Sequence, residues 1–256
     1  MRHLPMNIPL PDSCPAPRTN TLTTKHRAMT YPIKILLCLA ACISACVSPT
    51  PQGPQRVLIL GDSISMGYTK EVRTLLGSGY LVVRPMQKDG VRMENCAGTT
   101  KGIGNIDRWL ALDGGPWDVI HFNFGLHDLK RVDAQSRKNS DDPSSPPQAD
   151  IATYSKQLTN ITDKLEASGA TLIFATTTPV PPGKVRPHRD PKDVELYNAA
   201  ARAIMIPRQI AMDDLYTFAL PLLAEIQVPV NVHFTPEGSV ALAHEVARSI
   251  QAATTN

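Results

Sequence analysis

The chain has 256 residues, of which 42% are hydrophobic, so it is long enough for one globular domain and a tail. Its 26 Lys and Arg residues nearly balance its 23 Asp and Glu residues, and the formal net charge is +3. Nucleic-acid-binding proteins usually concentrate basic residues on one face, whereas the basic residues here are scattered along the chain. The composition therefore argues against a nucleic-acid partner.

The beginning of the chain shows the pattern of an export signal. Residues 1–28 are rich in Pro and Thr, and we expect an unstructured or untranslated leader there, because Met29 is a more usual start. An uncharged apolar stretch then runs from Ile35 to Val47 behind a basic flank. It is shorter than the about 20 residues that a transmembrane helix needs, but it is typical of a signal peptide.

The apolar stretch ends in Ile43-Ser-Ala-Cys46, which resembles the bacterial lipobox, in which the cysteine becomes lipidated. Leu39-Ala-Ala-Cys42 fits the same pattern but leaves a shorter apolar region. Prolines within residues 47–55 suit a tether better than a buried helix. We expect residues 29–46 to be a lipoprotein-type signal peptide. The protein would then be an exported bacterial lipoprotein, anchored to a membrane through Cys46 on the periplasmic or cell-surface side.

Residues 56–252 alternate between aliphatic runs and helical patterns, which predicts an α/β domain with a parallel sheet and helices on both faces. The runs that we expect to be strands are Arg56–Leu60, Tyr80–Arg84, Trp117–Phe124, Ala170–Thr176 and Arg208–Met212. The apolar residues expected to face the core from helices lie within Ile151–Leu165, Val194–Ile204 and Leu242–Ile250. Ligands of such folds bind at the carboxyl ends of the strands, where the polar segments Lys130–Gln148 and Pro179–Pro191 are predicted to form loops.

The sequence of this domain argues against a disulfide, a cysteine nucleophile and a metal site. Four of the five cysteines precede it, namely Cys14, Cys38, Cys42 and Cys46. The remaining thiol, Cys96, has no partner for an internal disulfide, and a lone small thiol is more often a core residue than a nucleophile. No cluster of His, Cys or carboxylate residues has the spacing of metal ligands, and no glycine-rich phosphate loop is present, so we expect no metal and no cofactor.

Ser63 is the candidate nucleophile. It ends the segment Gly61-Asp-Ser63, where the first aliphatic run gives way to a helix. A serine there projects from the carboxyl edge of the sheet, close to free amide groups at a helix N-terminus that favour developing negative charge. The competing interpretation is that Ser63 only caps the helix, a role that serine often fills.

Three further motifs supply groups that a serine nucleophile needs. His233 stands in the loop before the last helix, and imidazole titrates in the range needed to take the hydroxyl proton. Gly98, in Asn95-Cys-Ala-Gly98, offers an unobstructed backbone amide. His127, in Gly125-Leu-His127-Asp128, offers a side chain at the end of the third strand. Gly98 and His127 are therefore candidates for an oxyanion hole, which needs fixed donors.

The order of these motifs resembles that of the SGNH or GDSL hydrolase family. In that family a serine near the N-terminus is followed by a glycine, an asparagine in Gly-x-Asn-Asp and a histidine near the C-terminus. The resemblance spans Arg56 to Ala252 and implies a flavodoxin-like three-layer α/β/α sandwich with about five strands in a central parallel sheet. It also implies that Ser63 is the nucleophile and His233 the general base, with the amides of Gly98 and Ser63 as oxyanion donors.

The first departure from the family pattern is His127, which stands where the family has asparagine. A neutral imidazole carries one N–H, so we expect His127 to donate to the oxyanion. The alternative is that His127 is a core histidine or supports a residue of the site.

The second departure concerns the acid that orients the imidazole. Three residues before His233, where the family has an aspartate, stands Val230. Asn231, Asp213 and Asp214 remain as candidate orienting residues, although either aspartate can instead cap a helix that begins after it. Our working hypothesis is a Ser–His dyad steadied by a backbone carbonyl.

We expect hydrolysis of acyl esters, with carbohydrate O-acetyl esters or other small-molecule esters as substrates. Acyl transfer to another alcohol would use the same residues, and a non-catalytic binding lipoprotein on a hydrolase scaffold is the alternative from a different class. Several basic residues of the two predicted loops flank the cleft, namely Lys130, Arg131, Lys184, Arg186 and Arg189. They attract an acidic sugar or a lipid headgroup, or they are simply solvated.

Replacing the predicted lipidated residue tests the anchor. In a bacterial host, Cys46→Ser should move the protein from the membrane fraction to the soluble fraction, because the acyl chains that hold it would not be attached. The measurement is immunoblotting of fractionated cells, with Cys42→Ser as the matched control that should stay in the membrane. Unchanged membrane retention of Cys46→Ser would contradict the anchor.

Overall fold

The computed structural model describes residues 53–255. The predictions for the leader, the signal peptide, Cys46 and most of the tether concern residues outside this range. Within it, no helix combines the length and apolar character needed to cross a membrane.

The core of the domain is a parallel sheet in the order β2-β1-β3-β4-β5. The aliphatic side chains of β1 and all four residues of β3 are buried, which explains why these segments read as continuous apolar runs. The strands are β1 (Gln55–Leu60), β2 (Tyr80–Val83), β3 (Val119–Phe122), β4 (Thr171–Ala175) and β5 (Ala211–Asp213). The predicted α/β fold with a five-stranded parallel sheet is confirmed.

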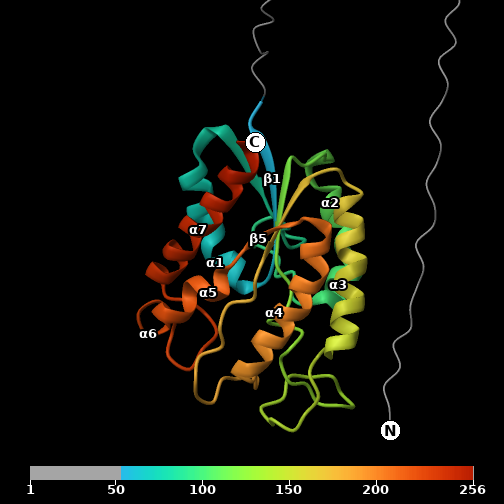
Figure 1. The fold of residues 1–256 in the computed structure, drawn as a ribbon, viewed down its shortest axis with the longest axis vertical. Helices are drawn as coiled ribbons and strands as arrows, with labels where there is room; N and C mark the ends of the chain where they lie inside the picture. Colours follow the sequence, from blue (N-terminus) through green and yellow to red (C-terminus); the bar gives the residue numbers. More distant parts are fainter. Residues whose placement is uncertain (1–52, 256) are drawn as a thin grey trace, which may run out of the picture. The chain divides into compact units, whose positions relative to one another are not determined.

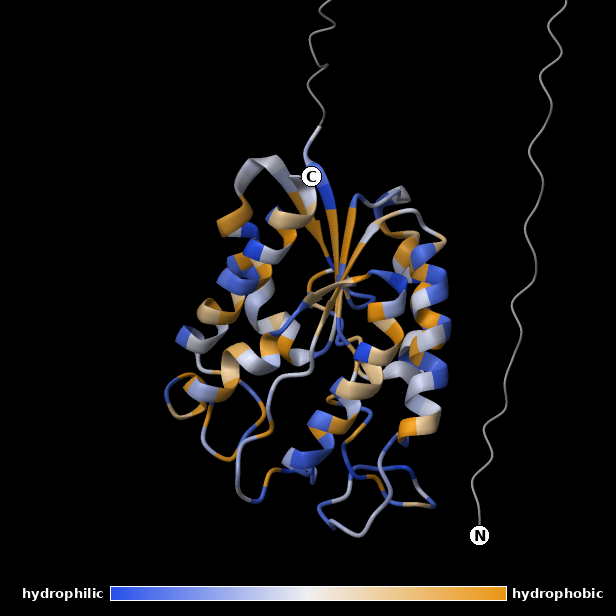
Figure 2. Ribbon diagram, viewed as in Figure 1, coloured by the Kyte–Doolittle hydropathy of each residue, from blue (hydrophilic) through white to orange (hydrophobic). Residues whose placement is uncertain are grey.

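Helices cover both faces of the sheet (Figure 1). On one face, α1 (Ser63–Leu76) packs against α7 (Pro236–Thr254), beside the short helices α5 (Leu215–Ala219) and α6 (Leu223–Ile226). On the other face, α3 (Ile151–Glu166) packs between α2 (Thr99–Leu110) and α4 (Pro191–Met205). Short 3-10 helices span Gly77–Gly79, Leu112–Gly114, Ile206–Arg208 and Leu220–Leu222. Figure 2 shows the apolar strands enclosed between these two layers.

The fifth strand and helix α2 differ from the sequence-based expectation. The fifth strand begins at Ala211 rather than at residue 208, because Ile206–Arg208 forms a 3-10 helix and Gln209 has a φ of 57°. Helix α2 was not predicted, since it contains two glycines, which weaken a helical pattern. One of them, Gly102, is needed for packing, because a Cβ there would lie 2.7 Å from Ile161 Cδ1 of α3.

Two long loops follow β3 and β4 at the carboxyl edge of the sheet, as predicted (Figure 1). Backbone hydrogen bonds join them, from Arg131 N to His188 O at 2.8 Å and from His188 N to Ser140 O at 2.9 Å. Because each loop holds the other, the residues at this edge have defined positions.

Candidate active site

Ser63 is the first residue of α1, immediately after the carboxyl end of β1. The helix is capped by Asp62, whose Oδ1 accepts a hydrogen bond from Ile64 N at 2.9 Å. The interpretation of Ser63 as the capping residue is therefore wrong. Because Asp62 satisfies the helix end, the Ser63 hydroxyl is available for another partner, and its residue is partly exposed.

That partner is His233, which lies 170 positions further along the chain. Its Nε2 is 2.9 Å from Ser63 Oγ, and its Nδ1 is 2.7 Å from Asn231 Oδ1. The same Oδ1 accepts the backbone N–H of His233 at 3.0 Å. Since this backbone group can only donate, the Asn231 atom must be the oxygen, and Nδ1 must carry the imidazole proton. Nε2 then presents its lone pair to the Ser63 hydroxyl, as a general base requires.

The loop that carries His233 is held at both ends. Val228 N donates to His233 O at 2.9 Å, and Thr235 N donates to Ile226 O at 2.9 Å. The Thr235 side chain then caps α7 by accepting from Gly238 N at 3.0 Å. The position of the imidazole is thus set by the backbone around it as well as by Asn231.

Asp128, which follows His127 in the chain and is fully buried, lies against Gly98. Asp128 Oδ1 accepts hydrogen bonds from Thr99 N at 2.8 Å and from Thr99 Oγ1 at 2.6 Å. A Cβ on Gly98 would lie 2.8 Å from the same Oδ1, so only glycine fits there without displacing the carboxylate. The candidate oxyanion amide and His127 are therefore neighbours of one buried carboxylate.

Burial also controls the charge of these groups. Burial lowers the pKa of His127 to about 4, against the opposing effect of Asp62 and with smaller effects from Lys130, Arg189 and His233. His127 is therefore neutral near pH 7 and has one N–H to donate, as its predicted role requires. Burial raises the pKa of Asp128 to about 6, although the hydrogen bonds from Thr99 oppose the rise.

The two aspartates proposed as orienting residues have other partners. Asp213 Oδ2 lies 2.9 Å from Nε2 of the buried His121. Asp214 caps α5 through Thr217 N and pairs with Arg202 at 2.7 Å. The expected backbone carbonyl at the imidazole is also not what the structure shows, because the Asn231 side chain occupies that place. Of the three candidates, only Asn231 contacts His233.

Sequence reasoning missed Arg84, a fully buried arginine that follows β2. Its guanidinium donates to Gly61 O at 3.3 Å, to Glu94 O at 2.9 Å and to the Thr69 hydroxyl at 3.0 Å. These bonds join the strand end before Ser63 to the segment that leads to Gly98. The signal in the sequence was a single arginine at the end of an aliphatic run.

Cys96 lies in that segment and is fully buried, which agrees with its interpretation as a core residue. Burial raises its pKa to about 11, so the thiol stays protonated near neutral pH. No group of His, Cys, Asp or Glu side chains within residues 53–255 is arranged to hold a metal ion.

A doubly wound α/β sandwich with a paired serine and histidine at its carboxyl edge has the architecture of a serine-dependent hydrolase. Residues 59–241 match the model of the GDSL-like Lipase/Acylhydrolase family, which is most of the chain. The chain therefore belongs to this family, as its motifs predicted, and is a hydrolase that acts on carboxylic ester bonds. No curated protein matches its sequence.

Solved structures share the fold at low sequence identity. A lipase/acylhydrolase from Enterococcus faecalis is 17% identical with a TM-score of 0.59, covering 77% of this chain and 96% of that one. A catalytic mutant of an acetylxylan esterase from Geobacillus stearothermophilus is 14% identical with a TM-score of 0.60, covering 78% and 96%. An acetyl xylan esterase, AlAXEase, is 16% identical with a TM-score of 0.57, covering 76% and 99%.

The Asn231 contact predicts a graded response to substitution. Asn231→Ala should lower kcat by about 10- to 100-fold, because the proton on Nδ1 loses its fixed acceptor. Asn231→Asp should raise kcat by about tenfold, because a carboxylate stabilises the imidazolium that forms during catalysis. Steady-state kinetics with p-nitrophenyl acetate measures both. Asn160→Ala, on the exposed face of α3, is the matched control. Equal activity of the two Asn231 variants would contradict an orienting role.

The raised pKa of Asp128 predicts a pH-dependent stability. Its protonated form is favoured in the folded state, so the associated stabilisation is present below the ordinary pKa of 3.8 and is lost as the pH rises through about 6. Between pH 4.5 and 7.5, the free energy of unfolding of the wild type should fall relative to that of Asp128→Asn by on the order of 2 kcal/mol. Urea denaturation measures the difference.

The matched control for Asp128→Asn is Asp150→Asn. Asp150 caps α3, and hydrogen bonds from Thr153 lower its pKa below the ordinary value of 3.8, so its contribution to stability is lost only at a pH below the range measured. Asp150→Asn should therefore keep the pH dependence of the wild type between pH 4.5 and 7.5. A wild-type stability that tracks Asp128→Asn at every pH would show that Asp128 does not titrate in this range.

Proposed function

We propose that this protein is a serine esterase in which Ser63 is the nucleophile and His233 is the general base. The observation that carries the proposal is the hydrogen bond between Ser63 Oγ and His233 Nε2, in a tautomer set by Asn231. A serine that served only packing would not need an imidazole with its lone pair directed at the hydroxyl. The same observation counts against a non-catalytic binding protein on this scaffold.

In this mechanism, Ser63 Oγ attacks the carbonyl carbon of the ester while its proton passes to His233 Nε2. The oxyanion of the tetrahedral intermediate accepts hydrogen bonds from the amides of Ser63 and Gly98 and from the N–H of neutral His127. When the intermediate collapses, His233 returns the proton to the departing alcohol and an acyl-enzyme remains. Water, deprotonated by the same imidazole, then attacks the acyl carbon and releases the acid and free Ser63.

The third member of the site is an amide rather than a carboxylate. Asn231 fixes the tautomer of His233, but it carries no charge to stabilise the imidazolium. His233 and Asn231 are both exposed, so water screens part of the charge that an acid would otherwise balance. We propose that the enzyme is therefore slower than one with a full triad, or is adapted to an activated ester.

We propose small acyl esters of carbohydrates, O-acetyl esters in particular, as the substrate class. Two of the structures with the same fold are described as acetylxylan esterases. The loops at the carboxyl edge are rich in polar and charged residues, which suit a hydroxylated substrate better than a long acyl chain. We further propose that the enzyme works outside the cytoplasm, tethered to a membrane through Cys46.

Replacing the nucleophile tests the central claim. A fluorophosphonate probe should label the wild type covalently. Ser63→Ala should abolish labelling and lower kcat for p-nitrophenyl acetate at least 1,000-fold, because no other hydroxyl within residues 53–255 bonds His233 Nε2. Intact-protein mass spectrometry measures the label. The matched control is Ser239→Ala, a serine of α7, which should keep labelling. A folded wild-type protein that ignores the probe and cleaves no acetate ester would overturn the proposal.

A further inference from the structure

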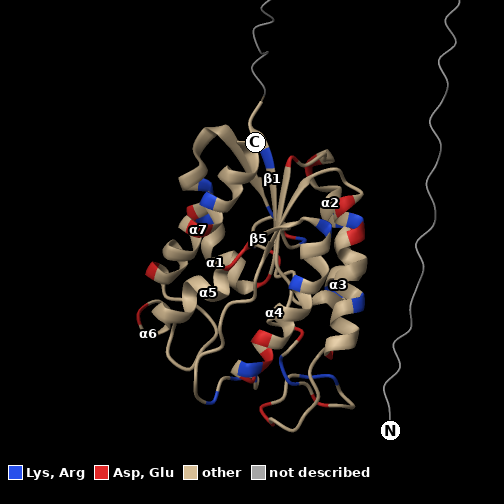
Figure 3. Cartoon of the chain, viewed as in Figure 1, with Lys and Arg blue, Asp and Glu red and all other residues tan. Residues whose placement is uncertain are grey.

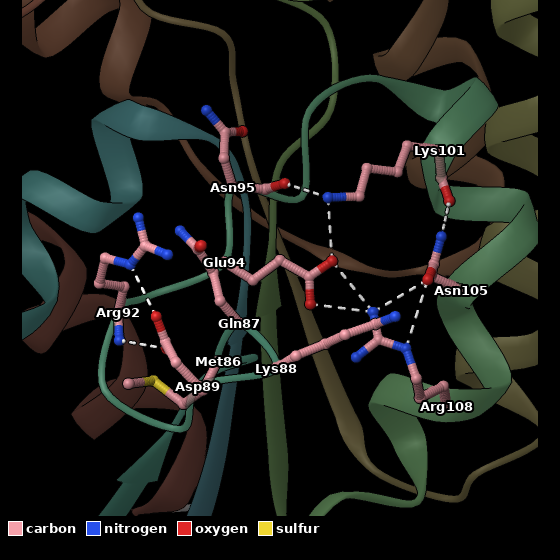
Figure 4. Close-up of a pocket in the computed structure, with 10 residues that line it drawn as sticks. All are labelled: Met86, Gln87, Lys88, Asp89, Arg92, Glu94, Asn95, Lys101, Asn105 and Arg108. Carbon is pink, nitrogen blue, oxygen red and sulfur yellow. Dashed lines mark hydrogen bonds and ion pairs between the residues drawn. The ribbon is translucent and has the colours of Figure 1, made fainter.

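A hollow near the candidate active site has no part in the mechanism above. It has a volume of about 860 Å³ and lies between the loop at residues 86–95, which follows β2, and one side of α2 (Figure 4). We call it the basic groove, and its lining residues are Met86, Gln87, Lys88, Asp89, Arg92, Glu94, Asn95, Lys101, Asn105 and Arg108. A space of this size holds several sugar units or a ligand of similar bulk.

The chemistry of the basic groove excludes an apolar ligand. Met86 is its only hydrophobic lining residue, and four basic residues outnumber two acidic ones. The groove therefore carries a net charge of +2. A concave surface focuses the electrostatic field of such charges on an anion that enters it. The amides of Gln87, Asn95 and Asn105 each bond within the protein, and their remaining N–H groups and lone pairs are of the kind that bind hydroxyl groups.

Glu94 fixes the basic residues of α2 in place. Its side chain is 12% exposed and accepts from Lys101 Nζ and Arg108 Nη2, each at 2.9 Å. Despite partial burial, these bonds keep the pKa of Glu94 below its ordinary value, so it stays ionised. Figure 4 shows its carboxylate joined to Lys101 and Arg108. Because both cations are already positioned, a ligand need not order them when it binds.

The opposite wall keeps donors free. Asp89 accepts from two amides of its own loop and from Arg92 Nε at 2.7 Å, which leaves both terminal nitrogens of Arg92 without a partner among the described residues. Lys88 forms no ion pair within residues 53–255. Figure 4 shows the Arg92–Asp89 pair on the loop, away from the Glu94 cluster. Arg92 and Lys88 are therefore available to an anion from outside.

The basic groove is joined to the candidate active site through the backbone. Asn95, one of its lining residues, is three positions before the oxyanion candidate Gly98. Cys96 N donates to Gly61 O at 3.1 Å, and Gly61 is two positions before Ser63. Lys101 Nζ also holds Asn95 O at 2.7 Å. The segment from Asn95 to Gly98 therefore connects the basic groove to the candidate active site.

Basic residues also lie in the loops at the carboxyl edge of the sheet (Figure 3). Arg189 is 6% exposed and donates to Leu126 O at 2.9 Å, beside His127, yet it has no carboxylate partner among the described residues. Burial lowers its pKa to about 10 and also lowers the pKa of the nearby Lys130. Both cations act electrostatically on His127, so positive charge also lies near this part of the candidate site.

We propose that the basic groove binds an anionic sugar chain, so that the ester cleaved at Ser63 is one carried by an acidic, carboxylate-bearing polysaccharide. The part of this inference that concerns ester cleavage rests on the proposed esterase function. The part that concerns binding of the anionic chain rests on the basic groove alone. Lys88 and Arg92 bind the sugar carboxylates, and the amides beside them bind hydroxyl groups. The binding is electrostatic in part, so it weakens as salt screens the charges.

A binding measurement tests the groove without catalysis. With the Ser63→Ala protein, isothermal titration calorimetry should show binding of oligogalacturonate at low salt, and at least fivefold weaker binding of the fully methyl-esterified, neutral oligomer. Lys88→Gln combined with Arg92→Gln should weaken the binding of oligogalacturonate at least fivefold. The matched control is Lys70→Gln combined with Lys156→Gln, which removes the same charge from exposed sites on α1 and α3. Equal loss in both double variants, or equal affinity for the two oligomers, would overturn the proposal.

A kinetic measurement joins the groove to the esterase. The measurement is the ratio of kcat/KM for acetylated polygalacturonate to kcat/KM for p-nitrophenyl acetate. With Ser63 intact, Lys88→Gln combined with Arg92→Gln should lower this ratio at least fivefold, mainly by raising KM for the polysaccharide. A protein that binds oligogalacturonate but cleaves neither ester would refute the esterase and leave the groove assignment standing. A protein that cleaves both esters with an unchanged ratio would refute the groove and leave the esterase standing.

Discussion

The geometry of the candidate site depends on the hydrogen bonds that Thr99 donates to the buried carboxylate of Asp128. These bonds join the start of α2 to the turn after β3, two segments that the sheet alone would leave as separate loops. They require a glycine at position 98, because any Cβ there would meet the carboxylate. Asp128 has one oxygen, Oδ2, without a hydrogen bond among the described residues, so the site retains a buried charge that is only partly satisfied. Close placement of Gly98 and His127 is obtained at a cost in stability.

The side chains expected to contact the oxyanion and the imidazolium of the reaction are both neutral. His127 is neutral because burial lowers its pKa, and Asn231 is neutral by its chemistry. Positive charge lies outside the reacting centre, in the basic groove and in the loops that carry Lys130 and Arg189. In the proposed mechanism, neutral N–H groups hold the oxyanion, while the surrounding cations act over longer distances on the rest of a substrate. The two functions are thus separated in space.

Much of this arrangement was predictable from the sequence, for identifiable reasons. Buried parallel strands have a simple apolar pattern, and their carboxyl ends meet at one edge, so the motifs alone assign Ser63, Gly98, His127 and His233 to one region. They leave the partner of His233 open among three residues, since the reach of a side chain depends on the backbone of a short loop. Arg84 was missed because two of its four acceptors are backbone oxygens and the other two are hydroxyls, and neither kind marks a partner in the sequence.

The turn before His233 restricts how this site could change. Asn231 N bonds Val228 O at 3.1 Å, and Val230 occupies the third position of that turn with a φ of 53°, a conformation uncommon for a β-branched residue. The Val230 side chain lies against Gly183 of the neighbouring loop, where a Cβ on the glycine would come within 3.2 Å. The family pattern places its carboxylate at position 230, and in this protein the side chain at that position lies against Gly183. Asn231 is the residue that already reaches the imidazole, so a carboxylate in contact with His233 is one substitution away at position 231 rather than at position 230.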